Sequence, residues 1–375
     1  MTFKLLDLDT DKTTTRTLLH EAIPLTGTIV SGTYGAPSVE TNIKNYSHGM
    51  FQSVYDYPYL SSSANHILDL SVGFASTSPL SASTAVQNAK KINVFNNIAG
   101  TLEGYTSASA LRLPESDLTV DLTGTMNSCF IIPISRLLTK DQIKLGSFSM
   151  AIGTGSWAAP FAGAGGNNWS SSGSLVYYVA ASGSAGIKAG TRQAKVGNCE
   201  VIYRRYGPAG NYTYSGQTED SEQGVGLVYH QAGVVILTSS IFDGLTEFIN
   251  PTDGRFKDLP LMGVTGALTG TSISGSCYAF RHRWYNMYFQ NTTEINSTIY
   301  FCRAGAPEFN SSTNPTYVSG SKMRVKSNAN DPQISYITTV GLYSSDNQLL
   351  AVGKLSEPLK KDPTNEVTIR VRLDY

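Results

Sequence analysis

Charged residues are scarce in this sequence. Lysine, arginine, aspartate and glutamate make up 15% of the 375 residues, and 28 basic residues balance 28 acidic ones; soluble domains typically contain about 25%. The chain can be divided into the blocks 1–100, 101–200, 201–300 and 301–375. The net charge of each block is at most two in magnitude. Binding to nucleic acid needs clustered Lys and Arg, and attachment to a membrane through a polybasic segment needs the same. The composition therefore predicts that neither a nucleic acid nor a membrane is a partner.

Targeting and metal-binding patterns are missing as well. The first residues show no basic stretch followed by an apolar run, so we expect no secretory signal. The four cysteines, Cys129, Cys199, Cys277 and Cys302, are at least 25 residues apart and form no CxxC pair. A zinc framework needs closer spacing. We therefore expect buried free thiols and no metal site.

Motifs of catalysis and of cofactor binding are also missing. The sequence contains no G-x-S-x-G nucleophile elbow. Its one Gly-Lys pair, Gly353–Lys354, is followed by leucine, so there is no phosphate-binding Walker loop. None of the five histidines has another His or a Cys within four residues. We therefore predict a protein that is not an enzyme and that carries no cofactor.

Short segments rich in β-branched and aromatic residues run through most of the chain, and turn residues separate them. Residues 367–373 alternate apolar and polar side chains, which is the period of a strand with one covered face. Polar residues interrupt the most apolar window, Val225–Phe242, so it fits two adjacent buried strands better than a membrane span. These patterns predict a mainly β protein of antiparallel sandwich or barrel domains. Only Thr139–Gly146 and Ser83–Lys91 suggest short helices.

The sequence suggests three regions. Residues 1–90 are rich in Thr, Ser and Tyr with broken patterning, and we expect an extended N-terminal arm for assembly. Residues 91–245 are expected to form a β-domain with an insertion at 145–187 that is rich in Gly and Ser and contains no charged residue. Residues 246–375 are expected to form a C-terminal β-sandwich domain.

Large aromatic side chains stand in segments where a solvated loop would not place them. Some lie in the charge-free insertion, some in a run of alternating tyrosines in the arm, and one ends a C-terminal strand. Low charge with many Tyr and Trp is typical of interface cores. The residues expected at an assembly interface are Tyr55, Tyr57, Tyr59, Trp157, Phe161, Trp169 and Tyr343.

Two C-terminal stretches carry a resemblance to a known family. They read FQNTTEINSTIYFCRAGAPEFNSSTNPTY (289–317) and SYITTVGLYSSDNQLLAVGKLSEPLKKDP (335–363). Both resemble the C-terminal region of a virion structural protein of T4-like myophages of marine cyanobacteria. The second stretch also resembles a strand–turn–strand unit of phage tail-fibre and baseplate attachment domains, and its residues 344–347 form a polar turn. The resemblance covers about residues 120–375 and includes no catalytic residue.

The resemblance implies a structural component of a tailed-phage virion, located in the tail or baseplate. Such a protein assembles with other virion proteins and with copies of itself, without catalysis. One alternative is a collar, neck or head-decoration protein. Another is a receptor- or carbohydrate-binding β-module of a phage appendage, in which Trp157, Trp169 and the tyrosines at 55, 57 and 59 stack on sugars.

Overall fold

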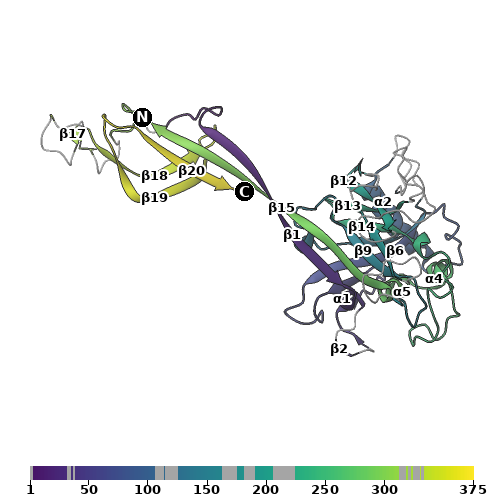
Figure 1. The fold of residues 1–375 in the computed structure, drawn as a ribbon. Coiled ribbons are helices and arrows are strands. Elements are labelled where there is room, and N and C mark those ends of the chain that lie inside the picture. Colours follow the sequence, from purple (N-terminus) through teal and green to yellow (C-terminus); the bar gives the residue numbers. More distant parts are fainter. Residues whose placement is uncertain are drawn as a thin grey trace. The chain divides into compact units, whose positions relative to one another are not determined.

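The computed structural model divides the chain into two compact units (Figure 1). Unit 1 contains Met1–Leu19 and Glu294–Tyr375, and unit 2 contains His20–Thr293. The chain passes from one unit to the other within two long strands, β1 (Lys12–Thr26) and β15 (Trp284–Ala304). The structure describes residues 3–31, 35–36, 39–105, 114, 126–162, 175–180, 191–205, 224–311, 318–319, 322–323, 330 and 333–375.

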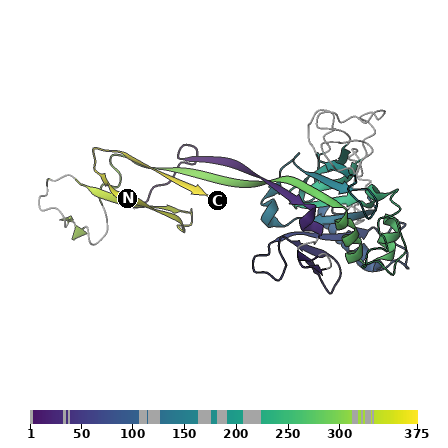
Figure 2. The ribbon, with the colours of Figure 1, turned by 60° about the horizontal axis from the view of Figure 1, so that its bottom comes forward.

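The fold is mainly β and antiparallel, as the sequence predicts. Fourteen strands form one sheet in the order β1-β15-β9-β10-β12-β13-β14-β7-β6-β5-β4, with β8, β11 and β20 attached to this path. Figure 2 shows β1 running beside β15, its neighbour in the sheet. Within the described ranges the two ends of the path do not pair with each other, so the sheet is not closed into a barrel. The same ranges contain five α-helices, more than the one or two that we expected.

The strands of unit 2 coincide with the apolar segments of the sequence. The window Val225–Phe242 contains two paired strands, β13 and β14, with Leu227 opposite Ile236, which confirms the prediction of two adjacent buried strands. The strand bounds are β2 Gly35–Ala36, β3 Val39–Glu40, β4 Ile43–Asn45, β5 Gln52–Tyr55, β6 His66–Phe74, β7 Ser128–Pro133, β8 Gln142–Ile143, β9 Ser149–Gly153, β10 Leu175–Val179, β11 Thr191–Ala194, β12 Gly197–Arg205, β13 Gly224–Tyr229 and β14 Val234–Thr238.

Helix α5 (Ile273–His282) packs on one face of this sheet. Ser272 begins the helix, because its side chain accepts a hydrogen bond from the backbone N–H of Gly275 at 3.2 Å. The Phe280 ring stacks on Phe130 of β7 with ring centroids 4.5 Å apart. Both rings are fully buried, and this stack lies within the hydrophobic core of unit 2.

Helix α2 (Asn88–Leu102) packs on the opposite face. Gly73 of β6 pairs with Cys129 of β7, so it points away from the side that Phe130 occupies. A Cβ atom at Gly73 would lie 2.7 Å from the backbone carbonyl oxygen of Lys91. The missing side chain therefore allows α2 to approach the sheet closely.

The two helices expected from the sequence are only partly correct. Thr139–Gly146 is not a helix, because α3 (Arg136–Thr139) ends where the expected helix would begin and β8 follows. The backbone N–H of Ile143 bonds to the carbonyl of His230 instead of to a helical turn. The expected helix Ser83–Lys91 overlaps α2 only from Asn88 onward. The remaining helical segments are α1 Gly27–Ser31, α4 Val264–Gly270 and the 3-10 turn η2 Ser239–Phe242.

The division into units differs from the three regions expected from the sequence. Residues 39–74 do not form an extended arm, since they contain strands β3 to β6. The side chains of Val54, Leu68 and Val72 are fully buried in the core of unit 2. Residues 246–293 likewise belong to unit 2. The sequence did not reveal the strands in residues 39–55 because β3 to β5 contain only two to four residues each, too few to show a period.

Unit 1 consists of strands and turns in its described part. The alternation expected for residues 367–373 is confirmed in β20, which pairs with β15 and whose residues alternate between half-buried and exposed. The hairpin expected at residues 337–355 is also present, as the separate pair β18–β19. The bounds in unit 1 are β16 Val318–Ser319, β17 Lys322–Met323, β18 Ser335–Tyr343, β19 Leu349–Lys361 and β20 Val367–Asp374.

Candidate functional site

The described part of unit 1 has almost no apolar interior. Among its described residues, the buried hydrophobic side chains are Ala304 and Leu342, each still 8–9% exposed. The buried cluster that forms the hydrophobic core lies between Leu25 and Phe289, entirely within unit 2. Burial of apolar surface is the main favourable term in folding. The described part of unit 1 therefore buries little apolar surface of its own.

Polar side chains occupy the interior of unit 1 instead. Lys361 at the end of β19 is fully buried. Its ammonium group donates hydrogen bonds to Asn310 Oδ1 at 2.8 Å and to the carbonyls of Ala306 and Asp362 at 3.1 and 2.9 Å. A buried charge needs such complete pairing. These contacts fix the loop after β15 to the end of β19, but they bury little apolar surface.

The hairpin β18–β19 carries the largest group of exposed apolar side chains in unit 1. Two-stranded sheets are marginally stable on their own, and this one is paired with no further strand among the described residues. We name its exposed large apolar side chains the hairpin patch. They are Tyr336 (64% exposed), Tyr343 (58%), Leu349 (52%), Leu350 (68%), Val352 (59%) and Leu359 (39%).

Three members of the hairpin patch share one face. Val352 lies directly opposite Gly341, and Leu349 lies opposite Tyr343. A Cβ atom at Gly341 would meet the Tyr343 ring at 3.0 Å and the Leu349 side chain at 3.4 Å. The tyrosine ring therefore lies over the glycine, a common way to cover a strand glycine. This contact holds Tyr343 in place although its ring is exposed.

The ion pairs of unit 1 are formed within the unit. Lys4 pairs with Glu308 at 2.8 Å, and Arg303 pairs with Asp11 at 3.0 Å. Hydrogen bonds with Lys4 and with the Gly305 backbone lower the pKa of Glu308. The other pairs are Arg16–Glu294, Lys360–Asp362 and Arg372–Asp374. These charges are therefore compensated before any partner binds.

The tyrosines of the expected arm lie at the surface of unit 2. The rings of Tyr55 and Tyr59 have centroids 6.4 Å apart, and Tyr55 contacts His66 edge-on at 5.5 Å. Tyr57 is 46% exposed and Tyr59 37% exposed, whereas Tyr55 is half-buried. Burial raises the pKa of Tyr55. The structure thus brings Tyr55 and Tyr59 together in unit 2, whereas Tyr343 belongs to unit 1.

Trp157 is not an exposed assembly residue. Its side chain is only 5% exposed and stacks on His282 of α5 with ring centroids 4.1 Å apart. Burial lowers the pKa of His282, whose Nε2 lies 2.9 Å from the Trp157 carbonyl oxygen. Phe161 is half-buried, and its ring centroid lies 5.3 Å from that of Tyr285. Both aromatic residues therefore pack within unit 2, while Trp169 lies outside the described residues.

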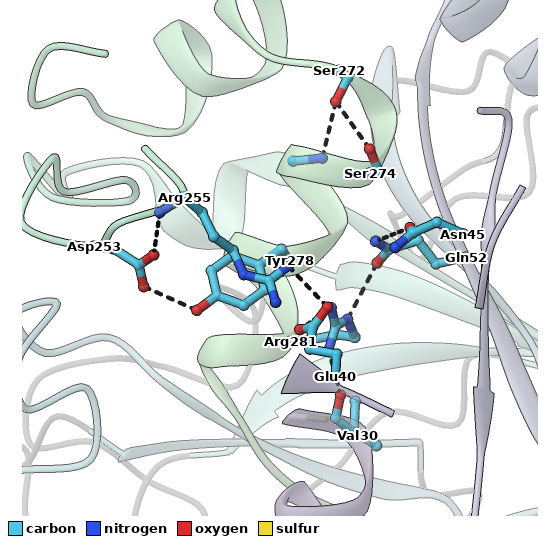
Figure 3. Close-up of polar contacts among 11 residues, drawn as sticks. Val30, Glu40, Asn45, Gln52, Asp253, Arg255, Ser272, Ser274, Tyr278 and Arg281 are labelled. Atoms are coloured by element: carbon cyan, nitrogen blue, oxygen red, sulfur yellow. Dashed lines mark hydrogen bonds and ion pairs between the residues drawn. The ribbon is translucent and has the colours of Figure 1, made fainter. Parts of the chain in front are cut away.

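A buried polar network joins β3 to α5 in unit 2 (Figure 3). Arg281 is fully buried and donates to Glu40 Oε1 at 2.7 Å, to Gln52 Oε1 at 3.2 Å and to the Val30 carbonyl at 3.0 Å. Breaking such a buried pair is strongly destabilising, because it leaves an uncompensated charge. The network thus attaches residues from the N-terminal part of unit 2 to α5.

Tyr278 extends this network to the loop before α4 (Figure 3). The Tyr278 hydroxyl donates to Asp253 Oδ2 at 2.9 Å. The guanidinium carbon of Arg255 lies 4.2 Å from the centroid of the Tyr278 ring. Arg255 also pairs with Glu40 at 2.9 Å. Burial and the hydrogen bond to Asp253 raise the pKa of Tyr278 to about 12. Because each of these groups has a partner in the same unit, the arrangement is that of a structural cross-link.

Three of the four cysteines are buried free thiols, as predicted, and Cys302 is half-buried. Burial raises the pKa of Cys129 and of Cys277. In the described part of the chain, no three His, Cys, Asp or Glu residues lie close enough to hold a metal ion. No helix there is both long and apolar enough to span a membrane.

The sequence identified Tyr343 but missed the rest of the hairpin patch. The available signal was LLAVGKL, in which consecutive apolar residues supply both faces of a strand. The buried cations Lys361, Lys91 and Arg281 left no signal, since nothing in their sequence neighbourhoods marks them as buried. Comparisons with protein-family models, curated proteins and solved structures give no match for this chain.

Proposed function

We propose that this protein is a non-catalytic structural component that acts by assembly, and that unit 1 is its assembly module. The observation that carries the proposal is the small number of buried apolar side chains in the described part of unit 1. The described residues of this unit form strands but bury only Ala304 and Leu342 among their hydrophobic side chains, so we infer that the unit gains stability from apolar surface of another chain. The hairpin patch is the apolar surface that it offers in return.

The virion setting of the proposal rests on the resemblance of residues 289–317 and 335–363 to T4-like phage structural proteins. Those residues coincide with β15, β18 and β19, the strands that form much of unit 1. A tail or baseplate subunit is covered by neighbours on several sides, which suits a low charge density and an uncovered strand pair. We therefore place the protein in a tail or baseplate.

Hydrogen exchange on the full chain tests the assembly module. The experiment uses a dilute solution in which the measured molecular mass is that of a monomer. There, the amides of β18, β19 and β20 should exchange at least 100-fold faster than those of β13 and β14. Addition of the protein that unit 1 binds should slow the exchange of these amides. If unit 1 were as strongly protected as unit 2 in a proven monomer, unit 1 would be stable alone and the proposal would be wrong.

The virion setting needs its own test, by mass spectrometry of purified phage particles. Peptides of this chain, and cross-links between unit 1 and tail proteins, are expected in isolated tails. Cross-links that involve unit 2 alone, or a chain missing from the particles, would contradict the setting.

A carbohydrate-binding module is the second candidate, and the exposed rings of Tyr57 and Tyr59 favour it. Aromatic rings at a surface can stack on sugar faces. A glycan array with the full chain should then show binding that is lost in Tyr57→Ala and Tyr59→Ala and kept in Tyr105→Ala, a still more exposed tyrosine of unit 2. No binding to any glycan would remove this candidate and leave the first intact.

A further inference from the structure

We propose that Lys361 and Asn310 react with each other to form an isopeptide bond, a covalent cross-link within unit 1, and that Glu308 assists the reaction as a base. Because the bond joins two side chains of one chain, it goes beyond the proposed function and does not depend on what unit 1 binds. The contacts of the two side chains, the loop that carries Asn310 and the carboxylate of Glu308 support the bond.

The two reacting side chains are buried and in contact. Lys361 Nζ lies 2.8 Å from Asn310 Oδ1. Since a carbonyl bond is about 1.2 Å long, the Asn310 Cγ atom lies at most about 4 Å from Nζ. The Ala306 carbonyl accepts hydrogen bonds from Nζ at 3.1 Å and from Asn310 Nδ2 at 2.8 Å, so it holds the attacking and the leaving nitrogen side by side. Groups held in such a geometry react many orders of magnitude faster than the same groups free in solution.

The loop after β15 is shaped so that Asn310 faces Lys361. Phe309 adopts a φ of 55°, in the left-handed region that large side chains rarely occupy. Its carbonyl accepts a hydrogen bond from the Ser335 side chain. Strained backbone of this kind persists only where the surrounding contacts enforce it, and it is common at functional sites. The loop therefore keeps the carboxamide directed at the amine.

Glu308 is the base of the proposed reaction. It precedes Asn310 by two residues in the same loop. Hydrogen bonds with Lys4 and with the Gly305 backbone lower the pKa of Glu308, and the charge of Lys361 lowers it further. Glu308 is therefore an ionised carboxylate that interacts with the ammonium group of Lys361, from which it can take a proton.

The reaction balances without an oxidant or a cofactor. Lys361 Nζ gives one proton to the Glu308 carboxylate, and the electron pair that this frees forms a bond to Asn310 Cγ. The bond between Cγ and Nδ2 then breaks. Nδ2 takes up the proton from Glu308 and a second proton from Nζ, and leaves as an ammonium ion. One ammonium side chain and one carboxamide thus give one secondary amide and one ammonium ion, and burial keeps out the water that would hydrolyse the carboxamide.

The cross-link closes a long loop of unit 1. The two residues are 51 positions apart, and the chain between them contains β18 and nearly all of β19. A covalent link over such a loop stabilises a fold mainly by restricting the unfolded chain. Units that bury little apolar surface are commonly held by staples of this kind. The bond therefore keeps the end of β19 attached to the loop after β15 even when the hydrogen bonds there open.

Intact-mass spectrometry of the purified full chain tests the bond. We expect a mass below that of the sequence by one ammonia, about 17 Da. After proteolysis, tandem mass spectrometry should identify a branched peptide that joins residues 310 and 361. Lys361→Arg keeps the positive charge but removes the amine, and should show the full mass. The matched control Lys360→Arg, at the exposed neighbouring lysine, should lose the ammonia like the wild type. Glu308→Gln should slow the loss at least tenfold.

The outcomes are decisive even if a variant fails to fold, because the wild-type mass is the primary measurement. A wild-type chain that keeps its full mass after days at pH 7.5 would overturn the bond. A loss of ammonia without the branched peptide would also overturn it, since cyclisation of an asparagine releases ammonia too. Glu308→Gln that links at the wild-type rate would refute the role of Glu308. Association does not enter these readings, so the proposed function is tested separately by hydrogen exchange.

Discussion

The strands of the two units are buried to very different extents. In unit 2, four of the five residues of β14 are buried, because the sheet is covered on both faces. In unit 1, the eight residues of β20 alternate between half-buried and exposed, and none is buried. Both segments contain valine and isoleucine, but every second residue of β20 is polar, whereas in β14 only the last residue is. The difference teaches that apolar periodicity specifies a strand, whereas its stability depends on what covers the apolar face.

The largest expected effect tests the core of unit 2. Phe280→Ala removes a fully buried ring that stacks on Phe130, and should lower the free energy of unfolding by about 3–5 kcal/mol. Leu342→Ala in unit 1 should cost less, about 2 kcal/mol, because Leu342 is still 9% exposed and lies outside the buried hydrophobic cluster. Urea denaturation with hydrogen exchange assigns each loss to its unit. Equal losses would show that unit 1 has a core of its own.

The next effect concerns the polar interior of unit 1. Lys361→Met leaves the carbonyls of Ala306 and Asp362 and the Asn310 side chain without their donor, and should cost about 2–3 kcal/mol. Lys360→Met is the matched control, since this neighbouring side chain is exposed and should cost at most about 0.5 kcal/mol. Exchange of the amides at residues 305–311 reports the effect. Similar exchange in the two variants would refute the role of Lys361.

A buried lysine in unit 2 predicts a pH dependence. Lys91 is fully buried and donates to the carbonyls of Leu268 and Thr271 at 2.5 and 2.6 Å, and burial lowers its pKa from 10.5 to about 8. Between pH 8 and pH 10.5 the unfolded chain therefore holds a proton that the folded chain has released, so stability should rise with pH. The expected gain is about 1–3 kcal/mol.

Urea titrations at pH 7.5 and pH 10 measure this gain. Lys91→Met serves as the comparison, because it removes the titrating group and should remove that part of the pH dependence. A wild-type stability that falls over this range in parallel with the variant would contradict the buried, easily deprotonated amine.

A smaller effect is expected in the network around α5. Tyr278→Phe removes the hydroxyl that donates to Asp253 but keeps the ring beside Arg255, so we expect a loss of about 1 kcal/mol. The variant Tyr285→Phe, at a 39% exposed tyrosine, should change stability by less than about 0.5 kcal/mol. Thermal unfolding distinguishes the two. A loss above about 3 kcal/mol would show that the network collapses as a whole.

The smallest effect sharpens the view of the hairpin. A Cβ atom at Gly353 would meet nothing within 4 Å, so Gly353→Ala should stabilise β19 by about 0.5 kcal/mol through lower chain entropy. At Gly341 the same change meets the Tyr343 ring at 3.0 Å and should bring no gain. Hydrogen exchange of β18 and β19 in monomeric chain compares the variants. A loss of protection in Gly353→Ala would mean that other atoms occupy the space beside Gly353 in solution.

The strands were the most predictable part of this fold. Residues 367–373 and the window Val225–Phe242 contain enough alternating or continuous apolar residues to define their structure. Helix α2 was placed poorly, because contacts with Gly73 of β6 and not a strong helical period determine its position. Trp157 was misjudged for a related reason. Its partner His282 is 125 residues away, and local sequence does not reveal such a contact.

The candidate surface was predictable only in part. Tyr343 was expected at an interface and is exposed on the hairpin, whereas the other members of the hairpin patch depend on which residues of unit 1 lack cover. That information requires the positions of β15, β18 and β20 together. Likewise, the sequence suggested an arm in residues 1–90, but Val54 and Leu68 pack into unit 2 because strands from beyond residue 127 cover them.

The composition of unit 1 from two distant stretches of chain has a consequence for synthesis. Its parts, Met1–Leu19 and Glu294–Tyr375, are separated by the whole of unit 2. During translation, β20 leaves the ribosome long after β1, so unit 2 has time to fold while unit 1 is still incomplete. The hairpin patch forms only once residues 335–361 have emerged. A nascent chain therefore exposes the hairpin patch last, after all of unit 2 has emerged.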